Sequence, residues 1–235
     1  MSTLWEKTIS AVLGLAALAI AVVELHREFG PQPASRNRAE YVADWRSMLP
    51  TAHMVGDQQA PITIIEFTDL QCPFCRRFNS ALASARVKYP NKIATAFVHF
   101  PLNGHGQAEA AARAVECAAA SGRFGEAVDF VFEKQDSLGK QPWTWFAAGA
   151  GVRDTLSFVH CMADSGVRRN VQAGLTLGKK IGVTGTPTVL LNGWRYSGTP
   201  SDTELVRAVG DLLSGKRPYK DFPKNGLPSR VSGTK

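Results

Sequence analysis

Cysteine is scarce in this sequence, at four of 235 residues, which excludes the disulfide-dense scaffolds of small secreted proteins. The chain also lacks a second CxxC spacing, an HxxxH spacing and a GxSxG motif. These absences argue against a four-ligand zinc site and against a serine hydrolase with a nucleophile elbow. No motif indicates a bound cofactor or metal. The length suits one domain with its own hydrophobic core.

Acidic residues are fewer than basic ones, 20 against 27, which gives a formal net charge of +7. Most of this excess lies in residues 216–235, where six Lys and Arg side chains face only Asp221. The rest of the chain is nearly neutral, so the charge does not indicate a nucleic-acid partner. The tail is also rich in Pro and Gly. We therefore expect 216–235 to be a basic disordered tail, with contact to anionic lipid as the alternative.

Long hydrophobic runs are also rare, and the main one is TISAVLGLAALAIAVV at residues 8–23. As a helix its sixteen residues would span about 24 Å, slightly less than a hydrocarbon core. We expect residues 1–29 to be a signal anchor, because the apolar run continues past the small-residue cleavage sites, or else a cleaved signal peptide. The first predicts a single-pass membrane protein with its domain on the extracytoplasmic (periplasmic) side. The second predicts a secreted or periplasmic protein.

Residues 51–215 have the patterns of one α/β domain. Apolar, β-rich runs at 61–67 and 92–100 enclose a helical segment that ends before Pro90, which predicts a strand–helix–strand unit. Residues from about 105 to 180 are mostly helical in pattern and predict a helical insertion.

Turn and cap signals mark the C-terminal part of this domain. Strand character returns after the insertion, and Asn192-Gly193 predicts a tight hairpin. Ser201, followed by Glu204, predicts a capping box at the start of a final helix. Before the domain, residues 30–50 are expected to form a linker and a short amphipathic helix.

The segment DLQCPFCRRF, residues 69–78, holds two of the four cysteines. If Cys72 precedes a helix that Pro73 begins, its thiolate is favoured by the free N–H groups and dipole of the helix N-terminus. Cys75 would follow about one turn later, within reach of a mixed disulfide at Cys72. A nucleophile beside a resolving thiol is what disulfide exchange requires.

Two other uses of this pair compete with redox chemistry. A zinc site would need two further ligands, and neither Cys117, Cys161 nor the five histidines have a matching spacing. A purely structural disulfide between Cys72 and Cys75 would close too small a loop to stabilise the fold appreciably. Exchange chemistry is therefore the preferred interpretation.

Two further features lie near this pair in the predicted fold. Glu66 interrupts an apolar run six residues before Cys72, where a carboxylate is costly unless it has a task or a partner. The alternative for Glu66 is an edge-strand position that faces solvent. Pro187 enters a predicted strand, and the Thr186–Pro187 bond can be trans or cis.

FTDLQCPFC, the helical stretch after it and VTGTPTVLLNG, in that order, resemble the DsbA-like branch of the thioredoxin superfamily. The likeness covers residues 50–214 approximately. It implies a thioredoxin fold with a central mixed sheet and an inserted helical subdomain, preceded here by one N-terminal hydrophobic helix. It also implies that Cys72 is the exposed nucleophile and Cys75 the resolving thiol.

The same resemblance gives roles to the neighbouring residues. Pro187 would be a cis-proline that faces the disulfide, and Thr186 would set redox properties and bind substrate backbone. Glu66 would be a buried acid that exchanges protons with the resolving cysteine. Many oxidases of the family have a histidine in the active-site dipeptide, whereas this chain has Pro73-Phe74.

The implied function is an exported thiol–disulfide oxidoreductase that exchanges its disulfide with cysteines of protein substrates, uses no cofactor and works with a membrane redox partner. Because the dipeptide lacks histidine, oxidant, reductase and isomerase all stay open. So do an electron relay to a dedicated membrane-associated partner and a non-catalytic chaperone or scaffold.

The remaining cysteines, Cys117 and Cys161, both lie in the predicted insertion. In an exported domain we expect them to form a structural disulfide, with two buried free thiols as the alternative. His99 and His105 lie at the end of the second strand and could approach the dithiol, although a loop histidine is more often solvated.

Overall fold

The computed structural model describes residues 13–14, 17–19, 40–196 and 198–218. The chain divides into two units, Met1–Arg38 and Ala39–Lys235. Most of the predicted apolar helix at 8–23 and most of the tail lie outside the described residues, so both stay predictions. Within the described ranges, no helix is long and apolar enough to cross a membrane.

The second unit is built on a six-stranded mixed sheet with the strand order β1-β6-β5-β3-β4-β2. The central strand β3 pairs parallel with β4 and antiparallel with β5, so the predicted mixed sheet is confirmed. Short strand β2, which sequence patterns did not indicate, adds an antiparallel edge beside β4. The strands are β1 (Glu40–Tyr41), β2 (His53–Val55), β3 (Ile62–Thr68), β4 (Ile93–His99), β5 (Thr188–Leu191) and β6 (Trp194–Arg195).

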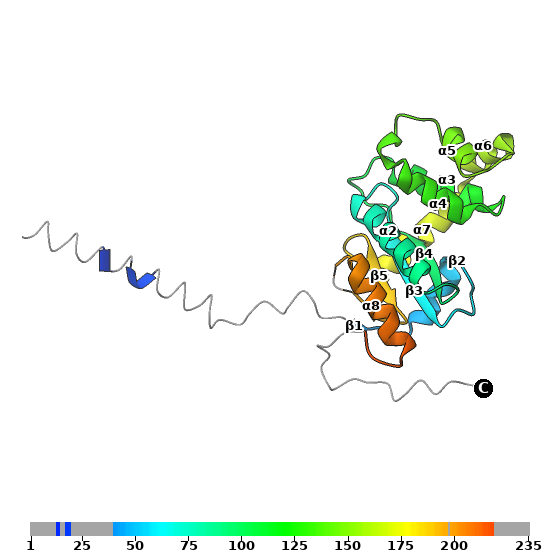
Figure 1. The fold of residues 1–235 in the computed structure, drawn as a ribbon. Helices are drawn as coiled ribbons and strands as arrows, with labels where there is room; N and C mark the ends of the chain where they lie inside the picture. Colours follow the sequence, from blue (N-terminus) through cyan, green and yellow to red (C-terminus); the bar gives the residue numbers. More distant parts are fainter. Residues whose placement is uncertain (1–12, 15–16, 20–39, 197, 219–235) are drawn as a thin grey trace, which may run out of the picture. The chain divides into compact units, whose positions relative to one another are not determined.

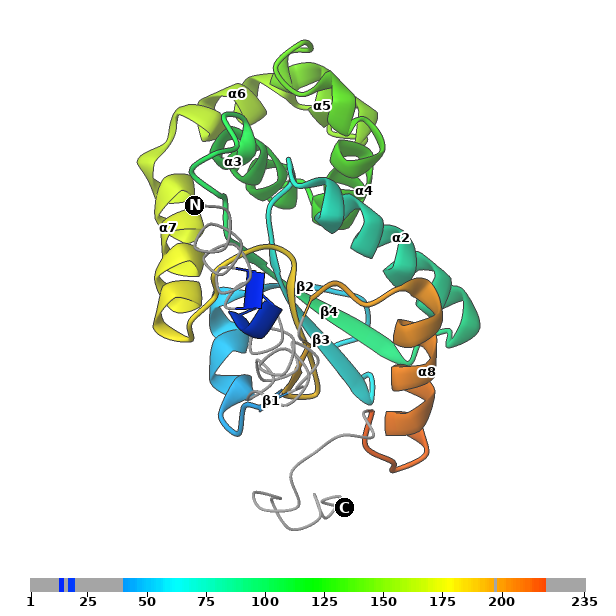
Figure 2. The same ribbon diagram turned by 90° about the vertical axis from the view of Figure 1, so that its left-hand side faces the viewer.

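Helices cover both faces of this sheet. Figures 1 and 2 show α2 (Pro73–Lys88) and α8 (Asp202–Leu213) together on one face and α7 (Ser165–Lys180) on the other. Side-chain alternation along β3 explains the two layers, because odd and even positions point to opposite faces. Ile62 and Ile64 pack with α2 and α8, whereas Ile65 and Phe67 pack on the opposite side.

The predicted insertion at about 105–180 is helical, but its last helix, α7, packs on the sheet. The remainder is a group of helices between β4 and α7, drawn in green at the top of Figure 2. Its apolar side chains form one core with the two cysteines of the CPFC segment. The insertion therefore packs on the start of α2 and shares its hydrophobic core with it. Its elements are α3 (Ala108–Ala119), α4 (Phe124–Glu133), the 3-10 helix η2 (Gln135–Ser137), α5 (Trp143–Gly149) and α6 (Thr155–Ala163).

Two glycines let α7 approach the sheet closely. A Cβ atom on Gly174 would lie 2.4 Å from the carbonyl oxygen of His99, and one on Gly178 would lie 2.4 Å from the Phe100 ring. Real Cβ atoms do not approach other atoms this closely, so larger residues would push the helix away. The Gly-x-x-x-Gly spacing thus serves packing between α7 and the end of β4.

The segment before the domain differs from the expected amphipathic helix. Residues 30–39 lie outside the described residues. Tyr41 lies in β1, which pairs with β6, and from residue 40 onward this segment is helical only at Trp45–Thr51, as the 3-10 helix η1. Pro50 lies inside η1 and cannot donate a backbone hydrogen bond, which disfavours a longer regular helix. Trp45 and Met48 are nevertheless buried against the sheet, so the apolar pattern correctly indicated a packed face.

The predicted turn and cap near the C-terminal end are confirmed. Asn192 and Gly193, with φ angles of 43° and 87°, connect β5 and β6, as expected for a two-residue hairpin turn. Ser201 accepts from the backbone N–H of Glu204, whose side chain accepts from the N–H of Ser201. This reciprocal pair completes the capping box at α8.

Cys117 in α3 and Cys161 in α6 form a disulfide across a sequence separation of 44 residues. We expect the double substitution Cys117→Ala/Cys161→Ala to lower the free energy of unfolding by about 2–4 kcal/mol, because the unfolded chain regains the entropy of an open loop. Denaturant titration would measure the loss. An unchanged unfolding midpoint would contradict this expectation. Native protein with its disulfides reduced also lacks the Cys117–Cys161 bond, so its stability should fall as well.

Candidate active site

The CPFC segment lies where the sheet meets α2. Cys72 is the N-cap of α2, with extended backbone angles, and Pro73 is the first helical residue. Cys72 is 3% exposed and Cys75, in the first turn, is fully buried, whereas Phe74 between them is 52% exposed. The predicted helix start is confirmed, whereas the expectation that Cys72 is exposed is wrong, because its side chain is buried.

The surroundings of Cys72 favour its thiolate. A hydrogen bond from Cys75 is the largest effect, and the side chain of Thr186 and the backbone N–H groups of Cys75 and Phe74 add to it. Partial burial opposes them, but the balance lowers the pKa of Cys72 to about 5. Cys72 is therefore almost fully ionised at neutral pH when the pair is reduced.

Cys75 has the opposite tendency. Burial raises the pKa of its thiol well above the usual range, and the neighbouring charges of Cys72 and Glu66 raise it further. The backbone N–H of Asp69 donates to its sulfur atom at 3.5 Å, which only partly opposes this effect. The two thiols thus divide into an ionised one and a protonated one.

Glu66 lies on the central strand β3, on the face that packs against α2, and is fully buried. The solvent-facing alternative for this residue is therefore wrong. Burial raises the pKa of Glu66 to about 8, while Thr68 and the positive charge of Arg86 oppose the shift. No hydrogen bond of normal geometry reaches either carboxylate oxygen among the described residues, so the contact with Thr68 is a weak one. Such a group is mostly protonated at neutral pH and can exchange a proton there.

The loop before β5 lies directly beside the dithiol. The Thr186–Pro187 peptide bond is cis, and the carbonyl oxygen of Thr186 lies 3.4 Å from the sulfur of Cys72. The structure thus brings together Cys72, Cys75, Thr186 and Pro187, from two segments more than 100 residues apart.

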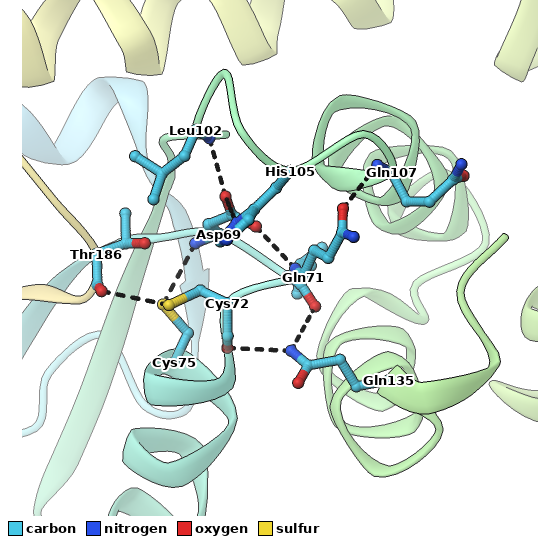
Figure 3. A network of polar contacts seen from close by, with 10 residues as sticks. Asp69, Gln71, Cys72, Cys75, Leu102, His105, Gln107, Gln135 and Thr186 are labelled. Carbon is cyan, nitrogen blue, oxygen red and sulfur yellow. Dashed lines mark hydrogen bonds and ion pairs between the residues drawn. The ribbon is translucent and has the colours of Figure 1, made fainter.

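Three residues near the site were missed by sequence reasoning. Figure 3 shows Asp69, which has a buried carboxylate, and Gln135 from the insertion, whose Nε2 atom donates to the carbonyls of Leu70 and Cys72. Arg86 extends from α2 to the hydroxyl of Thr95. Only Asp69 had a usable signal, since it directly follows the buried strand and precedes Cys72 by three positions.

His99, the last residue of β4, and His105, in the loop after it, have different surroundings. His99 is buried, and its Nε2 atom lies 3.0 Å from the carboxylate of Glu116. The Nδ1 atom of His105 lies 2.7 Å from the carboxylate of Asp69, beside the active-site turn. The solvated interpretation is therefore wrong for His99, whereas His105 contacts Asp69 and stays 27% exposed.

Comparison with known proteins identifies the family of this domain. The family model described as thioredoxin matches residues 48–211, more than half of the chain. The crystal structure of oxidised BdbD from Bacillus subtilis has a TM-score of 0.64 and 20% identity, covering 76% of this chain and 99% of that one. That of Pseudomonas aeruginosa DsbA2 has a TM-score of 0.55 and 27% identity, covering 68% and 92%.

The domain also resembles part of a much longer membrane transporter. The Na(+)/H(+) antiporter NhaA 1 of Mycolicibacterium gilvum is 34% identical over 163 residues, which are 67% of this chain. The match spans only 26% of that protein's length. The likeness thus concerns one segment of the antiporter, of about the size of the domain described above. Because the thioredoxin family model matches residues 48–211, more than half of the chain, the chain belongs to the thioredoxin family.

Proposed function

We propose that this protein is a thiol–disulfide oxidoreductase that transfers its Cys72–Cys75 disulfide to cysteine pairs of protein substrates. The observation that carries the proposal is the division of the two thiols: the pKa of Cys72 is lowered to about 5 and that of Cys75 is raised. This division supplies one stable leaving thiolate and one resolving thiol. A dithiol kept only for structure has no need of it.

In the first step, a substrate thiolate attacks the sulfur of Cys72. The new bond joins Cys72 to the substrate, the Cys72–Cys75 bond breaks, and Cys75 leaves with the electron pair. Glu66 is the proposed source of the proton that Cys75 then takes up, because it is mostly protonated near neutral pH and its charge acts on Cys75.

In the second step, the substrate's other thiolate attacks the substrate sulfur of the mixed disulfide. Cys72 leaves as a thiolate, so the substrate is oxidised to a disulfide and the enzyme is reduced. A stabilised leaving thiolate favours this direction, because it stabilises the reduced enzyme. In related oxidases a histidine in the dipeptide helps to stabilise this thiolate. In this chain, which has Pro73-Phe74, the hydrogen bond from Cys75 and the helix amides supply part of that stabilisation.

The proposed substrate surface surrounds the exposed ring of Phe74. This ring lies beside the Arg77 guanidinium, at 5.5 Å, and the Thr186–Pro187 loop lies over Cys72. An extended substrate chain would bind by apolar contact and by its backbone. Export, attachment through residues 8–23 and a membrane partner that reoxidises the dithiol belong to the same proposal.

The test is the reduction potential of the Cys72–Cys75 pair, measured in glutathione buffers. We expect a value of about −120 to −180 mV, in the range of disulfide donors and isomerases. A value near about −270 mV would instead indicate a reductase or electron relay. A pair that does not exchange would contradict the enzyme. A non-catalytic scaffold would also keep its cellular function after Cys72→Ser, whereas a disulfide donor would lose it.

A further inference from the structure

The carboxylate of Asp69 is held by hydrogen bonds from two directions. Asp69 is 1% exposed and lies in the turn between β3 and α2. Its Oδ1 atom accepts from the N–H of Gln71 at 2.7 Å, and its Oδ2 atom accepts from the N–H of Leu102 at 2.8 Å. The Nδ1 atom of His105 lies 2.7 Å from the same Oδ2 atom (Figure 3). A buried carboxylate is stable only with such partners.

The backbone of Asp69 contacts both redox cysteines. Its N–H donates to the sulfur of Cys75, and its carbonyl accepts from the N–H of Cys72 at 3.0 Å. Because the thiol of Cys75 in turn donates to Cys72, the Asp69 amide begins a chain of hydrogen bonds that ends at the thiolate. Each donor in such a chain strengthens the next one.

Of the three donors found on this carboxylate in the described part of the chain, His105 is the only side chain. The other two are backbone amides, which only a substitution to proline would remove. His105 comes from the loop after β4, whereas Asp69 follows β3, so the contact joins the ends of two neighbouring strands. Loss of His105 would leave a buried charge with one partner fewer, and the turn would shift to let water in.

We infer that His105 is a positioning residue for the dithiol: by holding the Asp69 carboxylate, it fixes the Asp69 amide on Cys75 and stabilises the reduced pair. The inference rests on the proposed function and adds a group that touches neither substrate nor the reacting sulfur atoms. It predicts that substitution of His105, at least 30 positions from either cysteine, changes the redox equilibrium.

The test compares three variants of the full-length protein in glutathione buffers. His105→Leu removes the donor, whereas His105→Asn keeps an N–H group at the position of Nδ1, since both nitrogens are two bonds from Cβ. His160→Leu, on the exposed face of α6, is the control for loss of a histidine.

We expect His105→Leu to shift the equilibrium about tenfold toward the disulfide, which is about 30 mV more negative. His105→Asn and the control should stay within about twofold of the native protein. A pH titration of each variant, followed by the ultraviolet absorbance of the thiolate, gives the ionisation midpoint of Cys72. This midpoint should be raised only in His105→Leu. A merely structural role would lower the melting temperature without moving either readout.

A folded His105→Leu protein with the native equilibrium would overturn the inference. If that variant does not fold, His105→Gln replaces it, because its amide lies one bond further from the backbone. The Gln variant should then shift about tenfold and the Asn variant should not, and equal values for the two would overturn the inference. Failure of the proposed function has a different signature, since the native protein itself would then not exchange with glutathione.

Discussion

Glu66→Gln is expected to raise the free energy of unfolding of the oxidised protein by about 4–5 kcal/mol at pH 9, and to leave it nearly unchanged at pH 4. The reason is that the pKa of Glu66 is about 8 in the folded protein and 4.5 for a model side chain. Glutamine has almost the same shape but never ionises. The oxidised form is chosen because its cysteines do not titrate.

The sign follows from proton binding. Below about pH 4.5 the carboxyl is protonated in both the folded and unfolded states, so it contributes nothing to pH dependence. Between pH 4.5 and 8 the unfolded chain releases the proton while the folded protein keeps it, and stability falls as pH rises. Above about pH 8 the loss is complete and constant.

Urea titrations of both proteins across this range would measure the effect. Glu133→Gln, at an exposed position of α4, should change stability by less than about 0.5 kcal/mol at every pH. Equal pH slopes for the native protein and Glu66→Gln would show that Glu66 is not the buried titrating group.

The same substitution should impair catalysis while it stabilises the fold. Without an ionisable group beside Cys75, formation of the internal disulfide should slow by about a hundredfold, the lower end of the usual contribution of an acid–base group. Stopped-flow oxidation would measure this rate. A more stable but slower variant would show that the cost of burying Glu66 is kept for function.

The parts of the fold that sequence predicts well have local causes. The β3–α2–β4 unit follows from two apolar runs and a helix bounded by Pro73 and Pro90. The hairpin at Asn192-Gly193 follows from two residues that tolerate positive φ. Each signal lies within a few positions of the structure it specifies, so no tertiary information is required.

The parts that sequence misses depend on distant contacts. The burial of Asp69 requires the loop after β4 to bring Leu102 and His105 back over the turn, more than 30 positions away. In isolation, an Asp at a strand end indicates an ordinary turn. Strand β2 and the 3-10 form of η1 were missed for a similar reason, because pairing and packing with the sheet override weak local propensity.

Cys75→Ser is expected to accumulate a stable mixed disulfide at Cys72 when it is mixed with oxidised glutathione. The Cys72 thiolate attacks the glutathione disulfide, one glutathione leaves as a thiolate, and no second thiol remains to displace the other. Cys72→Ser should form no adduct, because burial keeps Cys75 protonated and inaccessible. Intact-mass spectrometry of the two variants, with Cys117–Cys161 as an unchanging internal control, measures the outcome.

The rate of adduct formation tests how the thiolate is stabilised. In Cys75→Ser the rate should be flat above about pH 6 and fall through pH 5, because the hydroxyl of Ser can still donate to Cys72 and keep its pKa near 5. Cys75→Ala removes that donor, which is the largest cause of the shift. Its profile should therefore move toward the range of an ordinary thiol, with a midpoint several pH units higher. Identical profiles for the two variants would show that the helix amides and Thr186 alone hold the thiolate. Adducts at Cys75 in Cys72→Ser would reverse the two roles, and the division of the thiols on which the proposed exchange depends would be wrong.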